Sequence, residues 1–408
     1  MDSNYALVSA ALEAAAADGP YDYVIFTGDY LAHDFETLFQ QAGGKMKDYA
    51  AFTAKTVAYV NMKLRRTFPR TPILAALGNN DSDCGDYRLR PGSPLLTAMG
   101  ATLPLVARNP AALRSLAATG SYVVPHPTIA GRDVIVLDDV PAVPESSKQW
   151  AEQSWAQSTN DFPCATPAPA TPIDPMGWLG AALAQARAAG HGVTLVMHIP
   201  PGVDNYAASQ QGCPNGSPLL LDTRANDALV GLLRSYADVI RDVYAGHTHM
   251  DDFRVLLDAG GAGQIPIRIE PSVSPYFGNT PAFTAFDYDP ATGNATDYSA
   301  YAILPATAGP AASSWPLEYR FTAAYQLSDW GAASLGTLAG AIRSDAAARA
   351  TFGNFYESNP ALDPLTATGA NWLAYSCAET GLVPADYSAC TCPGAATPPA
   401  VAAPAGGG

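Results

Sequence analysis

The chain has 408 residues, of which 48% are apolar and 14% are charged. This composition predicts a folded protein with a large core and excludes a disordered chain. The net charge of −15 repels a phosphate backbone, so nucleic acid is not expected as a partner. An anionic substrate would need a local positive charge, and a bound metal ion supplies one.

The apolar patterns predict helices and strands that alternate along the chain, which is typical of an α/β protein. In chain order they are a helix over 3–18, a strand over 22–26, a helix over 46–66, and strands over 72–77, 120–125 and 133–138. A loop rich in Pro, Ala, Ser and Thr over 156–175 follows. Then come a helix over 177–189, a strand over 193–197, a helix over 224–236, strands over 239–244, 252–257, 266–270 and 283–288, and a helical region over 329–390.

Four of these strands end in polar side chains. Asp29, Asn79 and His198 each follow a strand, and the fourth strand leads to His247 and His249. Because active sites of α/β proteins lie at the carboxyl ends of strands, we expect these residues to converge.

The five side chains are suitable metal ligands. One carboxylate, one amide oxygen and three imidazoles, with no thiolate, suit zinc, manganese or iron. His247 and His249 are two residues apart, so on an extended segment both rings would face the same side. A lone Gly-Asp is usually a turn, and a lone histidine usually a hydrogen-bonded core residue. The ordered combination is more specific than its parts.

In this order the motifs resemble those of calcineurin-like metallophosphoesterases, and most closely those of the acid sphingomyelinase-like phosphodiesterases. The resemblance runs from about residue 4 to 392 and is carried by the segments TGDYLAHD (27–34), GNND (78–81), HIPPG (198–202), GHTHMDDF (246–253) and PLEYR (316–320). It implies a four-layer αββα sandwich over 1–305 and a C-terminal helical subdomain over 306–392. The tail over 393–408, made mostly of Pro, Ala and Gly, is expected to be disordered.

The resemblance also implies a metal site with two zinc ions. Asp29 would bridge the ions, Asn79, His198 and His247 would complete one site, and His249 would join the other. In such enzymes the metal pair clamps the phosphate and generates a hydroxide that attacks it.

The sequence departs from the family pattern at its start. The family opens with an Asp-x-His motif on a first strand, whereas no histidine precedes Asp29 here. The second metal site would keep only Asp29 and His249, so this chain is expected to hold one metal ion tightly. We interpret the first strand as missing through truncation; the alternative is a degenerate protein that has lost the site.

A second departure concerns the proton donor. The family motif Gly-Asn-His reads Gly78-Asn79-Asn80 here. Asn80 can hydrogen-bond a phosphate oxygen but cannot act as an acid. His33 is the natural replacement; the alternative is a structural hydrogen bond from His33 to a carboxylate such as Asp34.

The resulting prediction is a phosphodiesterase acting on a small-molecule or lipid substrate, with a sphingomyelin-like lipid favoured. The alternatives are a hydrolase of nucleotides or other small phosphoesters and a non-catalytic binding protein on the same fold. No apolar run could span a membrane, although peripheral lipid contact fits a lipid substrate. The start of the chain is not a signal peptide. Six cysteines suit either disulfides or reduced thiols; with a truncated N-terminus, the complete protein is expected to be secreted.

Overall fold

The computed structural model describes residues 2–144, 146–147, 173–211, 217–303, 314–358, 369 and 371–393. Nearly all of the predicted loop over 156–175, and the tail after residue 393, lie outside these residues.

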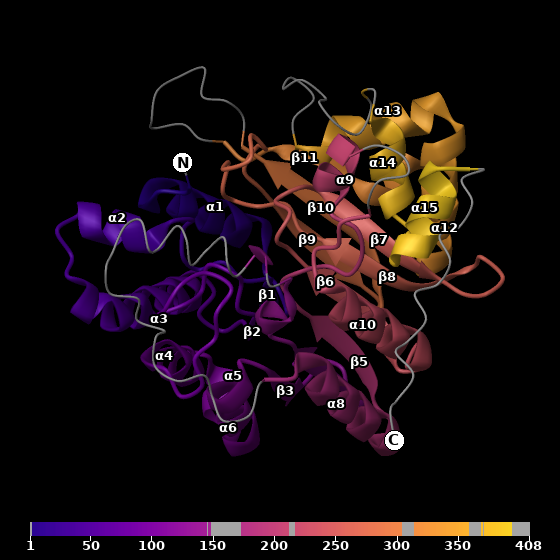
Figure 1. Ribbon diagram of the computed structural model, residues 1–408. Coiled ribbons are helices and arrows are strands. Elements are labelled where there is room, and N and C mark those ends of the chain that lie inside the picture. The colour runs from indigo at the N-terminus through magenta and orange to yellow at the C-terminus, as the bar shows by residue number, and fades with distance from the viewer. Residues whose placement is uncertain are drawn as a thin grey trace, which may run out of the picture.

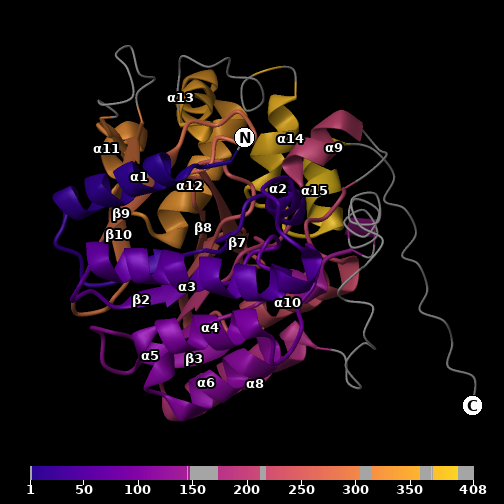
Figure 2. The ribbon, with the colours of Figure 1, turned by 90° about the vertical axis from the view of Figure 1, so that its left-hand side faces the viewer.

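Helices and strands alternate along most of the described chain, and the helices surround the strands (Figures 1 and 2). The helices are α1 (Tyr5–Asp18), α2 (Phe35–Gln41), α3 (Tyr49–Thr67), α4 (Pro94–Thr102), α5 (Pro104–Ala107), α6 (Pro110–Thr119), α8 (Pro175–Ala189), α9 (Asn205–Gln211), α10 (Thr223–Ser235), α11 (Phe321–Tyr325), α12 (Ala332–Ser344), α13 (Ala346–Tyr356), α14 (Trp372–Ala378) and α15 (Pro384–Thr391). The strands are β1 (Val24–Phe26), β2 (Ile73–Ala75), β3 (Tyr122–Pro125), β4 (Arg132–Val136), β5 (Gly192–Val196), β6 (Ile240–Ala245), β7 (Asp252–Leu257), β8 (Gly263–Ile269), β9 (Ala282–Tyr288), β10 (Ala295–Ala302) and β11 (Leu317–Arg320).

The largest sheet has six strands in the order β3-β4-β5-β6-β8-β7. Its four central strands are parallel, and the two edge strands β3 and β7 are antiparallel to their neighbours. A separate parallel pair joins β1 to β2, and an antiparallel sheet joins β9, β10 and β11. Among the described residues, β1 has no strand partner on its other edge, and its three residues are partly exposed.

Alternating side chains of the large sheet enter two different cores, as period-two strands require. Leu195 faces α8 and α10 and belongs to one core. Val196, the next residue, faces the other way and packs with Leu74 of β2 and with residues of α3 and α4. Helices therefore cover the outside of two stacked sheets, which confirms the predicted four-layer αββα fold.

The C-terminal helices pack against the edge of the large sheet. α12 contacts β7 and β8, and an aromatic core around Trp330 and Phe253 fills the space between helices and strands. A disulfide joins Cys377 of α14 to Cys390 of α15, and Cys84 is also disulfide-bonded. The domain boundary at residue 305 stays a prediction. No helix in the described part of the chain combines the length and apolar character that crossing a bilayer requires.

Candidate metal centre and active site

Two glycines allow the loops after β1 and β2 to touch. Gly28 has φ of +107°, and a Cβ at this residue would lie 2.6 Å from the backbone nitrogen of Gly78. A Cβ on Gly78 would lie 2.1 Å from Oδ1 of Asp29. No larger residue fits at either position unless one of the two loops moves. The glycines of the Gly28-Asp29 and Gly78-Asn79 pairs therefore allow Asp29 and Asn79 to approach each other.

Asp29 is held from two sides. Its Oδ1 accepts a hydrogen bond of 3.0 Å from the backbone N–H of Asn80, and its Oδ2 lies 3.4 Å from Nε2 of His198. Asp29 has φ of +59°, a left-handed conformation that costs energy in a non-glycine residue and is common at functional sites. The strain fixes the carboxylate toward the histidines.

Three donor atoms lie within 3.3 Å of one another. Oδ1 of Asn79 lies 3.0 Å from Nε2 of His198 and 2.9 Å from Nδ1 of His247, and these two ring nitrogens are 3.3 Å apart. Ligands bonded to one ion at 2.0–2.2 Å lie about 2.8–3.6 Å from each other in octahedral or tetrahedral geometry. The spacing of Asn79, His198 and His247 therefore fits three ligands of a single ion, and Oδ2 of Asp29, 3.4 Å from Nε2 of His198, lies next to them.

The amide of Asn79 is essential to this set. No group of three or more His, Cys, Asp and Glu side chains in the described residues could by itself hold a metal ion. The amide nitrogen of Asn79 donates to Oδ1 of Asn80 at 2.9 Å. This contact turns the amide oxygen of Asn79 toward the imidazoles of His198 and His247. The oxygen therefore lies within hydrogen-bonding distance of both rings.

A backbone carbonyl sets the tautomer of His198. Nδ1 of His198 donates to the carbonyl oxygen of Thr27 at 2.8 Å, so Nε2 is the nitrogen that faces the other donors and would bind a metal ion after losing its own proton. Burial lowers the pKa of His198, but the Asp29 carboxylate outweighs it and raises that pKa to about 9. Burial and the neighbouring His198 lower the pKa of His247 to about 3, so the two rings do not hold protons together.

The neighbours of Asp29 also shift the pKa of its own carboxyl group. Burial alone would raise the pKa of this carboxyl, but the facing His198 ring and the backbone N–H of Asn80 bring it below its usual range. Asp29 is thus an anion, as a metal ligand should be.

His249 and His33 lie next to this cluster. His249 is buried, and its Nδ1 has no hydrogen-bond partner among the described residues. Its ring centroid is 5.6 Å from that of His33 and 4.7 Å from that of Phe277. His33 stacks on Tyr276 with centroids 3.9 Å apart. An unpaired buried imidazole beside an exposed aromatic loop fits a site that receives a ligand.

The carboxylate that holds His33 is Asp2, which corrects the suggestion of Asp34. Nδ1 of His33 lies 3.1 Å from Oδ1 of Asp2, and the backbone N–H of His33 donates to Oδ2 of Asp2 at 3.0 Å. Asp34 instead adopts φ of +53° and directly precedes the first residue of α2. A carboxylate on Nδ1 fixes the ring and leaves Nε2 available.

The reason for expecting His247 and His249 on one side was wrong. Both residues have left-handed φ values of 71° and 69°, so the segment between β6 and β7 is a tight loop and not an extended strand. The N–H of Thr248 donates to the carbonyl of Gly246 at 2.8 Å, which closes this turn. The loop sends His247 to the Asn79 cluster and His249 toward His33.

Sequence reasoning missed residues that support the site without entering the donor set. Oδ1 and Oδ2 of Asp81 accept from the N–H groups of Leu31 and Gly78 at 3.0 and 2.8 Å. Burial, and after it the nearby Asp29, raise the pKa of Asp81 to about 7. The pattern Gly-Asn-Asn-Asp already contained Asp81, but no sequence signal pointed to Asp2 or to the Thr27 carbonyl.

No family model matches the chain. The chain is 26% identical over 374 residues to acid sphingomyelinase-like phosphodiesterase 3b of Homo sapiens, which covers 88% of this chain and 73% of that protein. It is 25% identical over 346 residues to a cyclic GMP-AMP phosphodiesterase of Bos taurus, which covers 83% of this chain and 69% of the relative. Among solved structures, a dimetal phosphatase from Danio rerio is 13% identical with a TM-score of 0.38, over 72% of this chain and 82% of that one.

Similarity of this length to acid sphingomyelinase-like phosphodiesterases supports a calcineurin-like metallophosphoesterase. Within that superfamily its relatives are the acid sphingomyelinase-like phosphodiesterases.

Proposed function

We propose that the chain is a metal-dependent phosphoric diester hydrolase and that a sphingomyelin-like lipid is its substrate. The observation that carries this proposal is the convergence of Asp29, Asn79 and His247 on Nε2 of His198, with donor atoms 2.9–3.4 Å apart. The names of the relatives support the reaction, since several are phosphodiesterases of sphingomyelin type or of cyclic GMP-AMP.

In this proposal Asp29, Asn79, His198 and His247 hold one divalent ion, zinc being favoured by the nitrogen-rich donor set. His249 and Asp29 form the weaker half of a second site. A divalent ion bound here would supply positive charge for the phosphate and lower the pKa of a water molecule. In a protein of net charge −15, local positive charge is needed to hold an anionic substrate.

His33 is proposed as the proton donor to the leaving group. Asp2 contacts its Nδ1 at 3.1 Å, which orients the ring and leaves the Nε2 edge free to face a leaving group. Asn80 is proposed to bind phosphate instead, because its amide Nδ2 is buried without a hydrogen-bond partner among the described residues. An unpaired donor of this kind gains a partner when a phosphate oxygen arrives.

The disulfides suit an oxidising compartment, which supports the proposal that the protein is secreted.

Hydrolysis of sphingomyelin and of cyclic GMP-AMP by the purified, metal-loaded chain tests the proposal. Release of phosphocholine from sphingomyelin is the expected result, and a higher rate on cyclic GMP-AMP would select the nucleotide alternative. The variant His198→Ala should lose activity on every substrate. His191→Ala is the matched control, since His191 pairs with Asp133 at 3.0 Å outside the cluster. No hydrolysis of any phosphodiester by metal-loaded protein would favour the non-catalytic alternative.

A further inference from the structure

The positive charge of this acidic protein is concentrated in one segment. Residues 45–70 contain seven of the 22 Lys and Arg residues and one of the 37 Asp and Glu residues, so the segment carries +6 in a chain of −15. The cations are Lys45, Lys47, Lys55, Lys63, Arg65, Arg66 and Arg70. Most of this segment is the helix α3, on the side of the molecule that faces the viewer in Figure 2.

One face of α3 is buried and the opposite face combines cations with large apolar side chains. The core face carries residues at helical spacing, among them Val57 and Leu64. On the outer face Phe52 is 39% exposed, Tyr59 45% and Met62 42%. These three residues lie at intervals of seven and three positions, so they form one stripe along the helix, and Lys55, Lys63 and Arg66 lie beside it. Phe52 also contacts two aromatic rings of α2.

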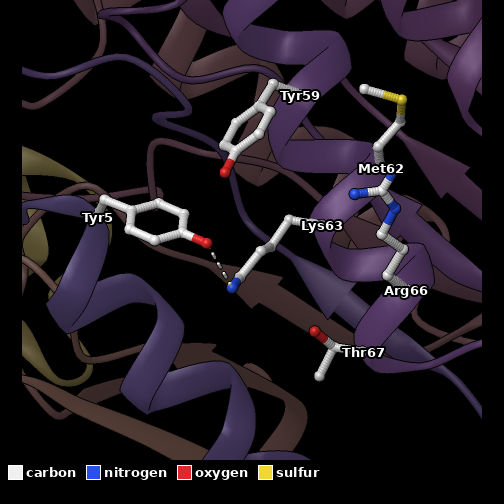
Figure 3. A pocket seen from close by; sticks show the side chains of 6 residues that line it. All are labelled: Tyr5, Tyr59, Met62, Lys63, Arg66 and Thr67. Carbon is white, nitrogen blue, oxygen red and sulfur yellow. Dashed lines mark hydrogen bonds between the residues drawn. The ribbon is translucent and has the colours of Figure 1, made fainter.

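A groove opens at the C-terminal half of this stripe, where α1 crosses α3 (Figure 3). It has a volume of about 210 Å³ and is lined by Tyr5, Tyr59, Met62, Lys63, Arg66 and Thr67. Tyr5 is 63% exposed, and Nζ of Lys63 lies 3.4 Å from its hydroxyl and 4.8 Å from its ring centroid. Among the described residues, neither Lys63 nor Arg66 is paired with a carboxylate, so both charges are available to an anion.

We propose that this surface, the outer face of α3 with Tyr5 of α1, binds the surface of an anionic membrane. Lys63 and Arg66 would contact lipid phosphate groups, while Tyr5, Tyr59 and Met62 enter the interface between head groups and acyl chains. Cations mixed with exposed aromatic and apolar side chains are the signature of interfacial binding. Charge complementarity selects an anionic surface, and the strongly negative remainder of the chain opposes wrapping by nucleic acid.

The position of the surface agrees with access to a lipid. Its first ring, Phe52, packs on Phe35 and Phe39 of α2, and α2 begins two residues after His33. Leu38 of α2 is 48% exposed. The proposal does not rest on the proposed hydrolysis, because membrane binding is measured without turnover.

Sedimentation of the full chain with vesicles tests the proposal. The anionic vesicles contain phosphatidylcholine and about 30 mol% phosphatidylserine, an anionic lipid of cytoplasmic leaflets. They are compared with vesicles of pure phosphatidylcholine at low and at high salt. We expect binding to the anionic vesicles that falls with salt. The double variant Lys63→Gln/Arg66→Gln should bind roughly 30-fold more weakly, since each cation near such a surface contributes about fivefold.

The matched control is Arg108→Gln/Arg224→Gln, which removes two exposed cations elsewhere, one in the turn after α5 and one in α10. It should bind like the unmodified chain, and thermal unfolding should show that both double variants are folded. Tyr59→Ser/Met62→Ser separates interfacial insertion from charge alone and should also weaken binding. No binding to anionic vesicles, or equal losses in the α3 and control variants, would overturn the proposal.

Discussion

The substitution Gly78→Ala tests how the candidate site is assembled. The new Cβ would lie 2.1 Å from Oδ1 and 2.4 Å from the backbone nitrogen of Asp29. Non-bonded heavy atoms need about 3.5 Å, so Asp29 and the loop after β2 must separate by roughly 1 Å. A misplacement of that size costs on the order of 100-fold in rate, and overpacking of a tight site costs about 1–3 kcal/mol of stability.

The assay is kcat/KM on an activated phosphodiester, bis(p-nitrophenyl) phosphate, together with the free energy of unfolding from urea titration. Gly231→Ala is the matched control, because a Cβ at Gly231 on α10 meets nothing within 4 Å. This control should keep full activity and gain up to about 1 kcal/mol of stability. If Gly78→Ala kept the activity of the unmodified chain, close approach of the two loops would not be what places Asp29.

Four further predictions follow from the same structure. Asn79→Ala removes the amide oxygen that faces the imidazoles of His198 and His247. The metal affinity, measured by calorimetric titration, should fall at least 10–100-fold. An unchanged affinity would show that Asn79 is not a ligand. His33→Gln should slow sphingomyelin hydrolysis by about 10²–10⁴ and leave bis(p-nitrophenyl) phosphate nearly unaffected, because that leaving group needs no proton; equal losses would assign His33 to binding or folding. Burial, and after it the charge of Arg132, lowers the pKa of His126 in the folded protein to about 4. Between pH 4 and about 6.5 the unfolded chain therefore binds more protons than the folded protein does. The free energy of unfolding should decrease as the pH falls through this range. Urea titration of His126→Asn should show a weaker pH dependence there, and an identical one would contradict the pKa assignment. The double variant Cys377→Ala/Cys390→Ala removes a disulfide between residues 13 positions apart. Its free energy of unfolding should be about 3 kcal/mol lower. An unchanged unfolding curve would show that the disulfide does not stabilise the protein.

The gathering of Asp29, Asn79 and His198 could be foreseen from sequence because each follows an apolar strand. Strand ends in an α/β fold meet at one edge, so the pattern alone predicts proximity. Which atoms face each other could not be foreseen. The orientation of the Asn79 amide depends on Asn80, and the tautomer of His198 depends on a carbonyl more than 170 positions away. A contact between residues as far apart as Thr27 and His198 leaves no local signal in the sequence.

Other parts of the fold were missed for local reasons. The helices α4, α5 and α6 lie between 94 and 119, where no element was predicted. Each begins with a proline, and Ser93 and Asn109 cap two of them through their side chains, which is a helix-start signal that could have been used. The strand β10 was missed because its sequence mixes Thr, Asp and Ser with Tyr. It forms by pairing with β9, and tertiary pairing overrides weak strand propensity.

The left-handed loop at His247 and His249 marks the limit of pattern reading. The spacing of two residues correctly drew attention to the pair, but the positive φ angles come from a turn that an extended pattern does not reveal. Such conformations cluster where a site constrains the backbone. Sequence alone therefore named these residues but misjudged the geometry that presents them.

Elemental analysis of the purified chain after zinc loading and removal of free metal tests the central claim most directly. Asn79, His198 and His247 bring three donor atoms together, Asp29 contacts His198, and His249 lies beside them, so we predict close to one tightly bound ion per chain. His198→Ala and Asn79→Ala should lose that ion, while His191→Ala should keep it. Absence of bound metal from the unmodified chain, or its retention in the His198 and Asn79 variants, would contradict the proposed metal centre.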